Sequence, residues 1–298
     1  MVVDFRQHKS PTWLLVVILS ITSGCSSSRG DRAETLRIRG SDTMLILAQA
    51  WAEEYAKVDS AVAVEVSGGG SGQGIAALVK GTIDIANCSR NVKPEESAQA
   101  RANTGKNPKE FVVGYDALAV FVHHQNPLDE ITLDQLAEIY RVDGNLDLWS
   151  QLGVRIPAGR EKIVRVNRQS SSGTYEFFRD NVLSKRDFQL GSLDMNGSKE
   201  VVELIASTPG AIGYSGMAFA TSDVKVLRVR SGEGTESYAP TTVNVLSKKY
   251  PISRSLLVYT LGEPRPSVRK YIDWLRSADG QQIVTDIGYV PLESGGRE

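Results

Sequence analysis

The stretch Ile163–Phe178 reads Ile-Val-Arg-Val-Asn-Arg-Gln-Ser-Ser-Ser-Gly-Thr-Tyr-Glu-Phe-Phe and predicts a strand, a loop and the start of a helix. Ile163 to Val166 has strand character, and apolar residues return at helical spacing after the loop. Between them stand Arg168 and a run of small polar residues that ends in Gly173 and Thr174. Amides in the first turn of a helix lack partners within it, and the helix dipole is positive there. This junction therefore suits an anion.

The same arrangement occurs twice earlier in the chain. Residues 36–39 predict a strand that leads into Gly40-Ser41-Asp42-Thr43 and then into a helix from Met44. Residues 62–66 predict a second strand, followed by a Gly/Ser loop over 67–74 and another helix. Ser and Thr are also ordinary N-cap residues, so each junction alone has a simpler interpretation. Three such junctions in one chain favour a shared site for a small oxyanion.

Four segments together resemble the phosphate-binding proteins of ABC-type phosphate importers. They are Gly40-Ser41-Asp42-Thr43, Gly69-Gly70-Ser71-Gly72-Gln73-Gly74-Ile75, Arg168 with Ser172-Gly173-Thr174, and Pro209-Gly210-Ala211-Ile212-Gly213-Tyr214. The similarity runs in order through nearly the whole mature chain. It implies an α/β, two-lobe periplasmic-binding-protein-like fold that closes around phosphate, with a discontinuous first lobe and two crossing strands.

The expected lobes are built from separate parts of the chain. Residues 35–114 and 256–298 are predicted to form lobe one, and residues 115–255 lobe two. Val112 to Val122 and Ser255 to Thr260 are the expected crossing strands. A mature chain of about 270 residues can bury enough apolar surface for two lobes. Alternating strands and helices favour parallel neighbours, with ligands beyond the carboxyl ends of the strands.

The first residues are expected to be a lipoprotein-type signal peptide over 1–24. A charged start leads into an apolar run over 13–21, and small residues precede Cys25. Cys25 is predicted to carry a lipid, although Thr22 stands where Leu is commoner, and a plain signal-peptidase site is the alternative. A polar linker over 25–34 would then separate the folded part of the protein from the membrane surface. We expect it in the periplasm or at the cell surface, anchored through Cys25.

Composition restricts the partners of this chain. The formal net charge of −1 does not indicate the excess of basic residues that is typical of nucleic-acid-binding proteins. Of the two cysteines, Cys25 would be lipidated, so Cys88 is predicted to be a small buried residue without a disulfide. We expect a monomer that needs no cofactor.

Enzyme motifs fail at particular residues. Gly69 to Gly74 has P-loop spacing, but Ile75-Ala76 follow where Lys and Ser or Thr are required. A loose dinucleotide fingerprint at 72–77 lacks the acid expected after the next strand. His123 and His124 are the histidines of the mature chain, and on one strand they would point to opposite faces. No triad or metal cluster can be built from them, so we expect a binding protein and no enzyme.

The resemblance implies the phosphate ligands residue by residue. Arg168 offers the planar fork that suits bidentate contact with an oxyanion. The expected ligands are Ser41, Thr43, the Met44 backbone, Ser71, Ser89 and Arg90 in lobe one, and Arg168, Ser172, Gly173 and Thr174 in lobe two. No metal is expected among them.

One position departs from the family pattern. Many members have Ala-Ser-Asp at the end of the third strand, where this chain has Cys88-Ser89-Arg90, although a related branch also carries Ser-Arg. In the family that Asp accepts the proton of phosphate and repels ionised sulfate, whereas arginine can accept nothing. We expect Asp42 or Asp116 to supply the acceptor, and a cap or hinge role is the alternative for each.

The predicted function is capture of inorganic phosphate and its delivery to an inner-membrane ABC permease. One alternative is a receptor for another oxyanion, such as sulfate, arsenate or a phosphonate. Another is a secreted anion-responsive regulator that presents its closed form to a membrane sensor. A phosphate-ester hydrolase is disfavoured because the sequence offers no catalytic base or metal cluster.

Overall fold

The computed structural model describes residues 33–156 and 160–293. The predicted signal peptide over 1–24, Cys25 and most of the linker over 25–34 lie outside these residues. Ala33–Glu298 forms one compact unit of the chain. In the described ranges no helix has the length and apolar character needed to cross a membrane.

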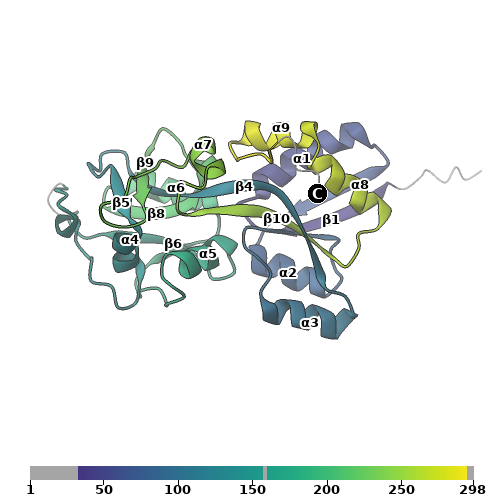
Figure 1. Cartoon of the computed structure of the whole chain (residues 1–298), viewed down its shortest axis with the longest axis horizontal. Helices are drawn as coiled ribbons and strands as arrows, with labels where there is room; N and C mark the ends of the chain where they lie inside the picture. The colour runs from purple at the N-terminus through teal and green to yellow at the C-terminus, as the bar shows by residue number, and fades with distance from the viewer. Residues whose placement is uncertain (1–32, 157–159, 294–298) are drawn as a thin grey trace, which may run out of the picture. The chain divides into compact units, whose positions relative to one another are not determined.

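The first lobe confirms the predicted alternation of strands and helices. Its parallel strands lie in the order β2 (Val62–Ser67), β1 (Glu34–Gly40) and β3 (Ile85–Cys88). Its helices are α1 (Leu45–Val58), α2 (Ser71–Val79), α3 (Pro94–Thr104), α8 (Pro266–Leu275) and α9 (Ala278–Ile287). Figure 1 shows α1, α8 and α9 on one side of the sheet and α2 and α3 on the other. The loops after β1, β2 and β3 share the carboxyl edge of this sheet, where ligands of α/β folds bind.

Apolar side chains fill the space on both faces of this sheet. Leu36 of β1 is fully buried with Trp51 and Tyr271, and burying one leucine contributes about 1.5–3 kcal/mol. The Trp51 indole N–H donates to the Gly280 carbonyl at 2.8 Å and ties α1 to α9. On the other face Cys88 is buried beneath α2 and α3, and burial raises the pKa of its thiol. The prediction that Cys88 is a small buried residue is confirmed.

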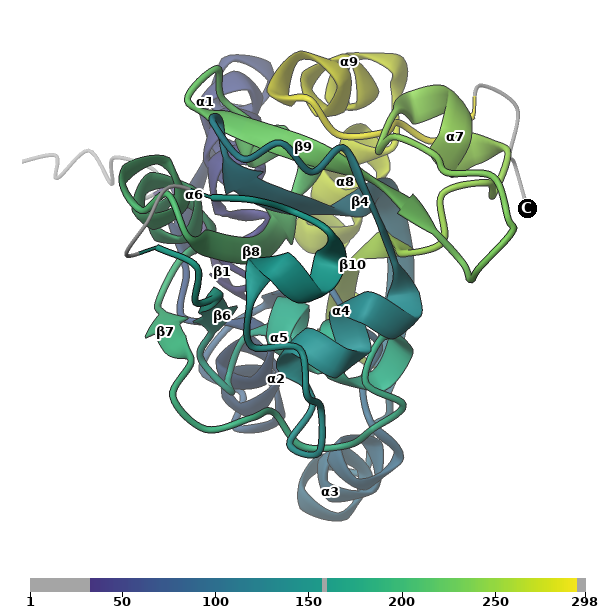
Figure 2. The ribbon, with the colours of Figure 1, turned by 90° about the vertical axis from the view of Figure 1, so that its left-hand side faces the viewer.

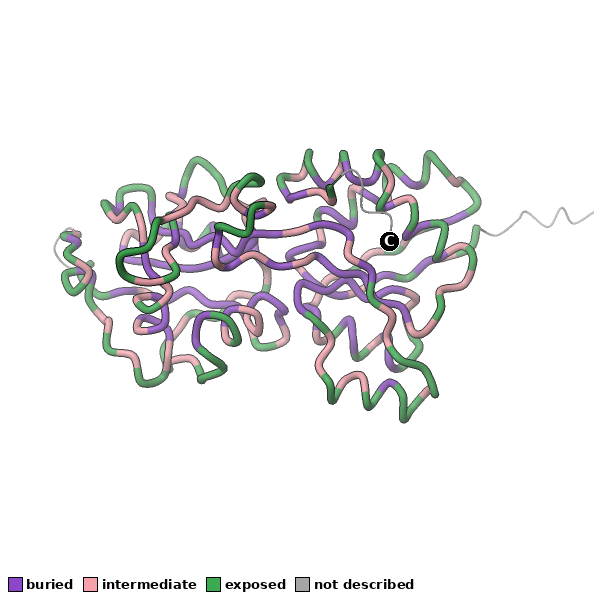
Figure 3. The backbone as a smooth tube through the Cα atoms, in the orientation of Figure 1, coloured by how far each residue is buried: buried purple, intermediate pink, exposed green. Residues whose placement is uncertain are grey.

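Two strands belong to both lobes. β4 (Pro108–His123) and β10 (Ser253–Leu261) pair with each other antiparallel, with a register shift at Leu256/Leu257. β10 also pairs with β3 in lobe one, and β4 pairs with strands of lobe two. Figure 1 shows β4 and β10 side by side between the lobes, and the tube in Figure 3 is buried along most of their length. The predicted crossing strands are confirmed, while the lobe boundaries at 114/115 and 255/256 stay a prediction.

The second lobe is a mixed sheet with helices on both faces. Its strands are β5 (Glu130–Thr132), β6 (Val164–Arg168), β7 (Leu193–Met195), β8 (Ala211–Gly216) and β9 (Val224–Arg230), and its helices are α4 (Leu133–Tyr140), α5 (Gly173–Asn181), α6 (Ser198–Ser207) and α7 (Thr242–Leu246). Short 3-10 helices lie at Trp149–Leu152 and Met217–Phe219. β6 lies between β7 and β8 and is parallel to both. Figure 2 shows α6 on one side of β8 and α4 and α5 on the other.

Successive residues of β4 serve the two faces of this second sheet. Leu118 and Val120 pack with Phe178 of α5, whereas Ala119 and Phe121 pack in the layer beneath α6. This alternation is the period of two that a β-strand imposes on its side chains. Because both faces are covered, the strand is apolar throughout this part, as a buried central strand must be.

Local details of the second lobe include one correction. The Thr132 hydroxyl accepts the Gln135 amide at 3.0 Å and caps α4, while Ile131 lies in β5. His123 and His124 do not point to opposite faces, because their ring centroids are 4.2 Å apart. β4 ends at His123, and His124 begins the turn that follows. Among the described residues, no group of three or more His, Cys, Asp or Glu could hold a metal ion.

Candidate functional site

Three helix N-termini meet where the lobes touch. Thr43 lies just before α1 and Thr174 lies in the first turn of α5, and their hydroxyl oxygens are 2.8 Å apart. Ser71 opens α2 and lies against Gly173, where an added Cβ would stand 2.3 Å from the Ser71 hydroxyl oxygen and 2.6 Å from that of Ser89. The predicted junctions therefore come together, and only a residue without a side chain fits at position 173.

Serine hydroxyls line the first-lobe side of this meeting point. The Ser41 hydroxyl donates to the Ser89 hydroxyl at 2.9 Å, and the Ser71 hydroxyl oxygen lies 3.4 Å from that of Ser89. The Ser89 amide donates to the Ser71 hydroxyl at 3.1 Å. All three are buried. Because a hydroxyl hydrogen can rotate from one acceptor to another, these groups can turn from each other to an anion.

The glycine loop before α2 brings Ser71 to this position. Gly69 and Gly70 have φ values of 113° and 95°, in the region that side-chain-bearing residues rarely adopt. A Cβ on Gly70 would stand 2.4 Å from the Ser171 carbonyl oxygen of the other lobe. Gly72 donates its amide to that same carbonyl at 3.2 Å. The loop therefore needs glycine both for its conformation and for the close approach of the second lobe.

Arg168 is the charged group at the second-lobe side. It ends β6, is fully buried, and donates to the Ser198 hydroxyl at 2.9 Å and the Asn196 carbonyl at 2.9 Å. It also donates to Asp42 of lobe one at 3.1 Å. Burial lowers the pKa of Arg168 and Asp42 opposes that shift. Its Nε is buried without a hydrogen-bond partner, and an anion could satisfy that donor.

The two acids expected to accept a proton both lie at the site, each paired with an arginine. Asp42 accepts the Gly69 amide at 2.7 Å through Oδ1 and Arg168 through Oδ2. Asp116 of β4 is fully buried and accepts Arg254 at 2.8 and 3.0 Å through Oδ2, and the Met217 amide at 3.1 Å through Oδ1. Burial raises the pKa of Asp116 and Arg254 opposes that shift. Each carboxylate keeps acceptor capacity, since two oxygens offer about four acceptor positions.

Two expected ligands have other partners in this structure. The Met44 amide donates to the Ser41 carbonyl at 3.1 Å and closes a turn before α1. The Ser172 hydroxyl accepts the Thr174 amide at 3.1 Å and caps α5. Ser172 thus has the ordinary capping role that a serine before a helix predicts, and it remains beside the candidate site.

Arg90, another expected ligand, is paired with acidic side chains in this structure. Its guanidinium donates to both carboxylate oxygens of Glu96 at 2.8 Å and to the Asn91 carbonyl at 2.8 Å. Its Nε lies 3.0 Å from a carboxylate oxygen of Glu176 in α5, which also pairs with Lys93 at 2.7 Å. Arg90 is thus held by two acids and links the lobes beside the site. The spacing could not reveal this, because Glu176 belongs to the other lobe.

Sequence reasoning missed Arg254. It stands at the start of β10, is 6 % exposed, and donates to the Thr174 hydroxyl at 3.0 Å and the Thr43 hydroxyl at 3.4 Å. The signal was present as a lone arginine in front of the apolar run Leu256 to Leu261. A buried charge of this kind needs a partner, and Asp116 is that partner.

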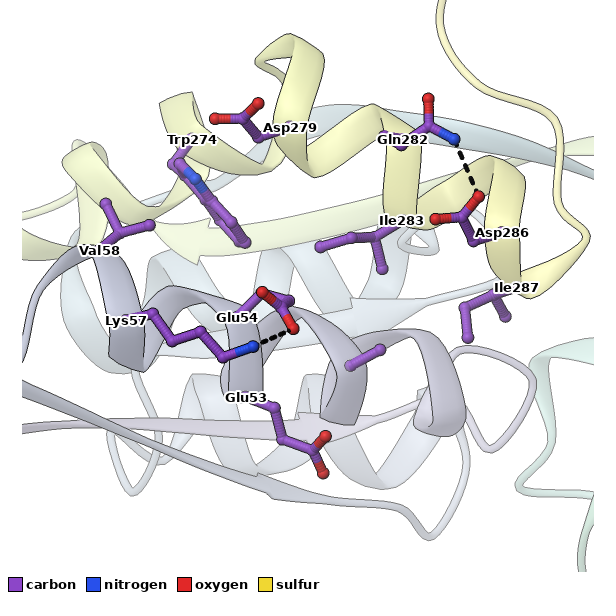
Figure 4. A pocket seen from close by; sticks show the side chains of 11 residues that line it. Glu53, Glu54, Lys57, Val58, Trp274, Asp279, Gln282, Ile283, Asp286 and Ile287 are labelled. Atoms are coloured by element: carbon purple, nitrogen blue, oxygen red, sulfur yellow. Dashed lines mark hydrogen bonds and ion pairs between the residues drawn. The ribbon is translucent and has the colours of Figure 1, made fainter.

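A separate groove of about 550 Å³ lies on the first lobe between α1 and α9. Figure 4 shows Trp274, Ile283 and Ile287 along it, with several acids around them. None of the expected ligand residues lines this groove. The candidate site is the buried polar cluster between the lobes.

Comparison with known proteins places the chain in a family. Residues 26–279 match the model of the PBP superfamily domain. The phosphate-binding protein PstS of Pseudomonas aeruginosa is 33% identical over 263 residues, which cover 85% of this chain and 81% of that protein. The chain belongs to the PstS family of the PBP superfamily. PstS of Bacillus subtilis is 31% identical over 274 residues, covering 91% of this chain and 85% of that protein.

Solved structures agree with this PstS family assignment. A phosphate-bound ABC transporter substrate-binding protein from Clostridium perfringens matches with a TM-score of 0.76 and 28% identity, over 87% of this chain and 100% of the other. An ABC-type phosphate transport receptor from Vibrio cholerae matches with a TM-score of 0.69 and 25% identity, over 86% and 100%. The resemblance drawn from the Gly/Ser loops and the predicted two-lobe fold are both confirmed.

Proposed function

We propose that this protein captures inorganic phosphate between its two lobes and delivers it to an ABC permease of the inner membrane. The observation that carries the proposal is the meeting of Thr43, Ser71 and Thr174, each at a helix N-terminus, beside the buried Arg168. Helix N-termini and a planar guanidinium both favour tetrahedral oxyanions. Relatives named for phosphate binding or phosphate transport support the choice of anion.

Closure of the lobes follows from the distribution of these groups. Thr43 and Ser71 belong to lobe one, and Arg168 and Thr174 to lobe two, so one anion could bond both lobes. Such an anion stabilises the closed arrangement over an open one by its differential contacts. An affinity near micromolar corresponds to roughly −8 kcal/mol, which a set of charge-assisted hydrogen bonds can supply after ordering costs.

Delivery to a permease requires that the protein stay near the membrane. The apolar run over 13–21, followed by small residues and Cys25, supports export and lipidation of that cysteine. A polar linker over 25–34 would then hold the two-lobe unit away from the bilayer. The protein would act as a monomer in the periplasm or at the cell surface.

Binding without catalysis is the class of function that the site supports. The buried cluster consists of hydroxyls, backbone amides and arginines that already have acidic partners. These groups can hold an oxyanion, and relatives carry names that describe binding. A receptor for another oxyanion and a secreted anion-responsive regulator share this chemistry, so ligand and partner must be tested separately.

Calorimetric titration of the detergent-solubilised chain with phosphate, sulfate, arsenate and a phosphonate tests the ligand. The proposal predicts a single site with affinity near micromolar for phosphate and much weaker binding of sulfate. Equal binding of sulfate and phosphate would favour the general oxyanion receptor. Phosphate-stimulated ATP hydrolysis by the reconstituted permease would separate transport from regulation.

A further inference from the structure

We propose that Arg254 is a second cationic donor to the bound oxyanion, so that one guanidinium comes from lobe two and another from the crossing strand. This inference rests on the proposed function and assigns a residue to the same site. Arg254 lies in β10, which pairs with β3 of lobe one and with β4. Its guanidinium could therefore donate to the anion whether the anion first binds lobe one or lobe two.

The contacts of Arg254 lead to the same hydroxyls that are expected to bind the anion. Its Nη2 donates to the Thr174 hydroxyl at 3.0 Å and to the Thr43 hydroxyl at 3.4 Å, and those hydroxyls lie 2.8 Å from each other. Its Nη1 donates to the Ser89 carbonyl at 3.3 Å. A group that reaches Thr43, Thr174 and Ser89 together is at the centre of the candidate site.

The surroundings of Arg254 make a charged contact strong. It is 6 % exposed, and the ring of Phe177 lies 5.5 Å from its guanidinium carbon. A guanidinium excluded from water interacts with an anion more strongly than one in bulk solvent. The Nε and Nη2 of Arg254 donate to Asp116 at 3.0 and 2.8 Å, and these two bonds fix the plane of the guanidinium.

A purely structural role for Arg254 is the competing explanation, because a buried Asp116 needs a counter-charge in any case. The two explanations differ once Asp116 is made neutral. If Arg254 only neutralises the charge of Asp116, removing Arg254 from an Asp116→Asn background leaves the affinity for phosphate unchanged. If Arg254 binds the anion, its removal from that background still weakens binding.

The experiment compares Asp116→Asn with the double variant Asp116→Asn/Arg254→Gln by calorimetry with phosphate and with sulfate. We expect the double variant to bind both anions at least about tenfold more weakly than Asp116→Asn does, because a cationic donor can bind any oxyanion. Arg254→Lys, which keeps a charge opposite Asp116 but loses the planar fork, should weaken phosphate binding several-fold. The matched control is Asp147→Asn against Asp147→Asn/Arg165→Gln, because Arg165 is as buried, pairs with Asp147 and donates to the Ile139 carbonyl in lobe two. That control pair should bind phosphate equally.

Two results would overturn the inference while leaving the proposed function intact. One is affinities for phosphate within about threefold for Asp116→Asn and the double variant, together with unchanged binding by Arg254→Lys. The other, should the Arg254→Gln variant not fold, is a folded Arg254→Lys variant that binds phosphate and sulfate as the parent does. A parent chain that binds no phosphate would instead overturn the proposed function itself.

Discussion

The hydroxyl oxygens of Thr43 in lobe one and Thr174 in lobe two lie 2.8 Å apart, although 131 residues separate them in the chain. Both side chains are almost completely buried. This contact joins the N-terminal ends of α1 and α5 at the place where the lobes touch. Each of these hydroxyls has a hydrogen that could be donated to an oxyanion bound between the lobes.

Thr174→Val tests this contact because valine keeps the size of threonine and removes the hydroxyl. Leaving a buried polar partner unsatisfied costs about 1–3 kcal/mol, so phosphate affinity should fall roughly tenfold. Calorimetry on the parent and the variant gives the comparison. Thr285→Val on the exposed side of α9 is the control and should bind as the parent does.

Arg168→Ala should weaken phosphate binding much more. The change leaves a desolvated anion without its charge-assisted donor, and truncating one partner of a buried charged pair costs about 3–5 kcal/mol. The same titration on Arg179→Ala, a partly exposed arginine of α5 paired with Asp187, should give the parent affinity. Weakening by less than about tenfold, or roughly 1.4 kcal/mol, would remove Arg168 from the site.

Acid should weaken the ion pair between Glu96 and Arg90 in lobe one. Burial alone would raise the pKa of Glu96, but hydrogen bonds from Arg90 and the Lys93 amide lower it overall. The unfolded chain, with a glutamate pKa of about 4.3, then binds the proton more readily than the folded chain. The stabilising contribution is present above that value and is lost as the pH falls through the lower folded-state pKa.

Urea unfolding as a function of pH measures this contribution. The free energy of unfolding of the parent should fall more steeply than that of Glu96→Gln as the pH decreases below about 4. Glu95→Gln changes an exposed neighbour in the same helical turn and should follow the parent curve. Parallel curves for parent and Glu96→Gln would show that the ion pair with Arg90 contributes nothing to stability.

Lipidation of Cys25 is predicted from the segment that precedes it. Mass spectrometry of the membrane fraction should find a diacyl- or triacyl-modified Cys25 as the first residue of the mature protein. Cys25→Ser should release the protein from that fraction without changing its affinity for phosphate. A soluble parent protein that begins at another residue would contradict the prediction.

Local sequence predicted the junctions but not the ion pairs that join them. Strand patterns followed by Ser and Gly placed the starts of α1, α2 and α5, because helix capping and glycine conformations are local properties. The pairs Arg254–Asp116 and Arg168–Asp42 join residues that are 138 and 126 positions apart, so no spacing could reveal them. Helix α3 was not predicted for another reason. Ala100 is its buried residue, so the segment has no apolar residues that repeat at helical spacing.

Rejection of sulfate is the prediction that depends most on these distant pairs. Hydrogen phosphate brings a donor that needs an acceptor, whereas ionised sulfate brings none. Arg90 cannot accept a hydrogen bond, so we expect Asp42 or Asp116, each paired with an arginine, to be the acceptor. An asparagine there can turn its NH₂ group toward a sulfate oxygen. The responsible change, Asp42→Asn or Asp116→Asn, should weaken phosphate binding and allow sulfate to compete.

Competition titrations with sulfate on the parent and on both variants identify the acceptor. The Asp42 Oδ1 accepts the amide of Gly69 in the glycine loop. Asp116 instead pairs with Arg254, which also donates to the Thr43 hydroxyl. If one variant alone admits sulfate, its parent carboxylate accepts the proton of phosphate. If selectivity survives both changes, a different group accepts the proton and the assignment to these acids is wrong. If the parent itself binds sulfate as well as phosphate, no acceptor operates, and the two arginines make the site a general oxyanion receptor.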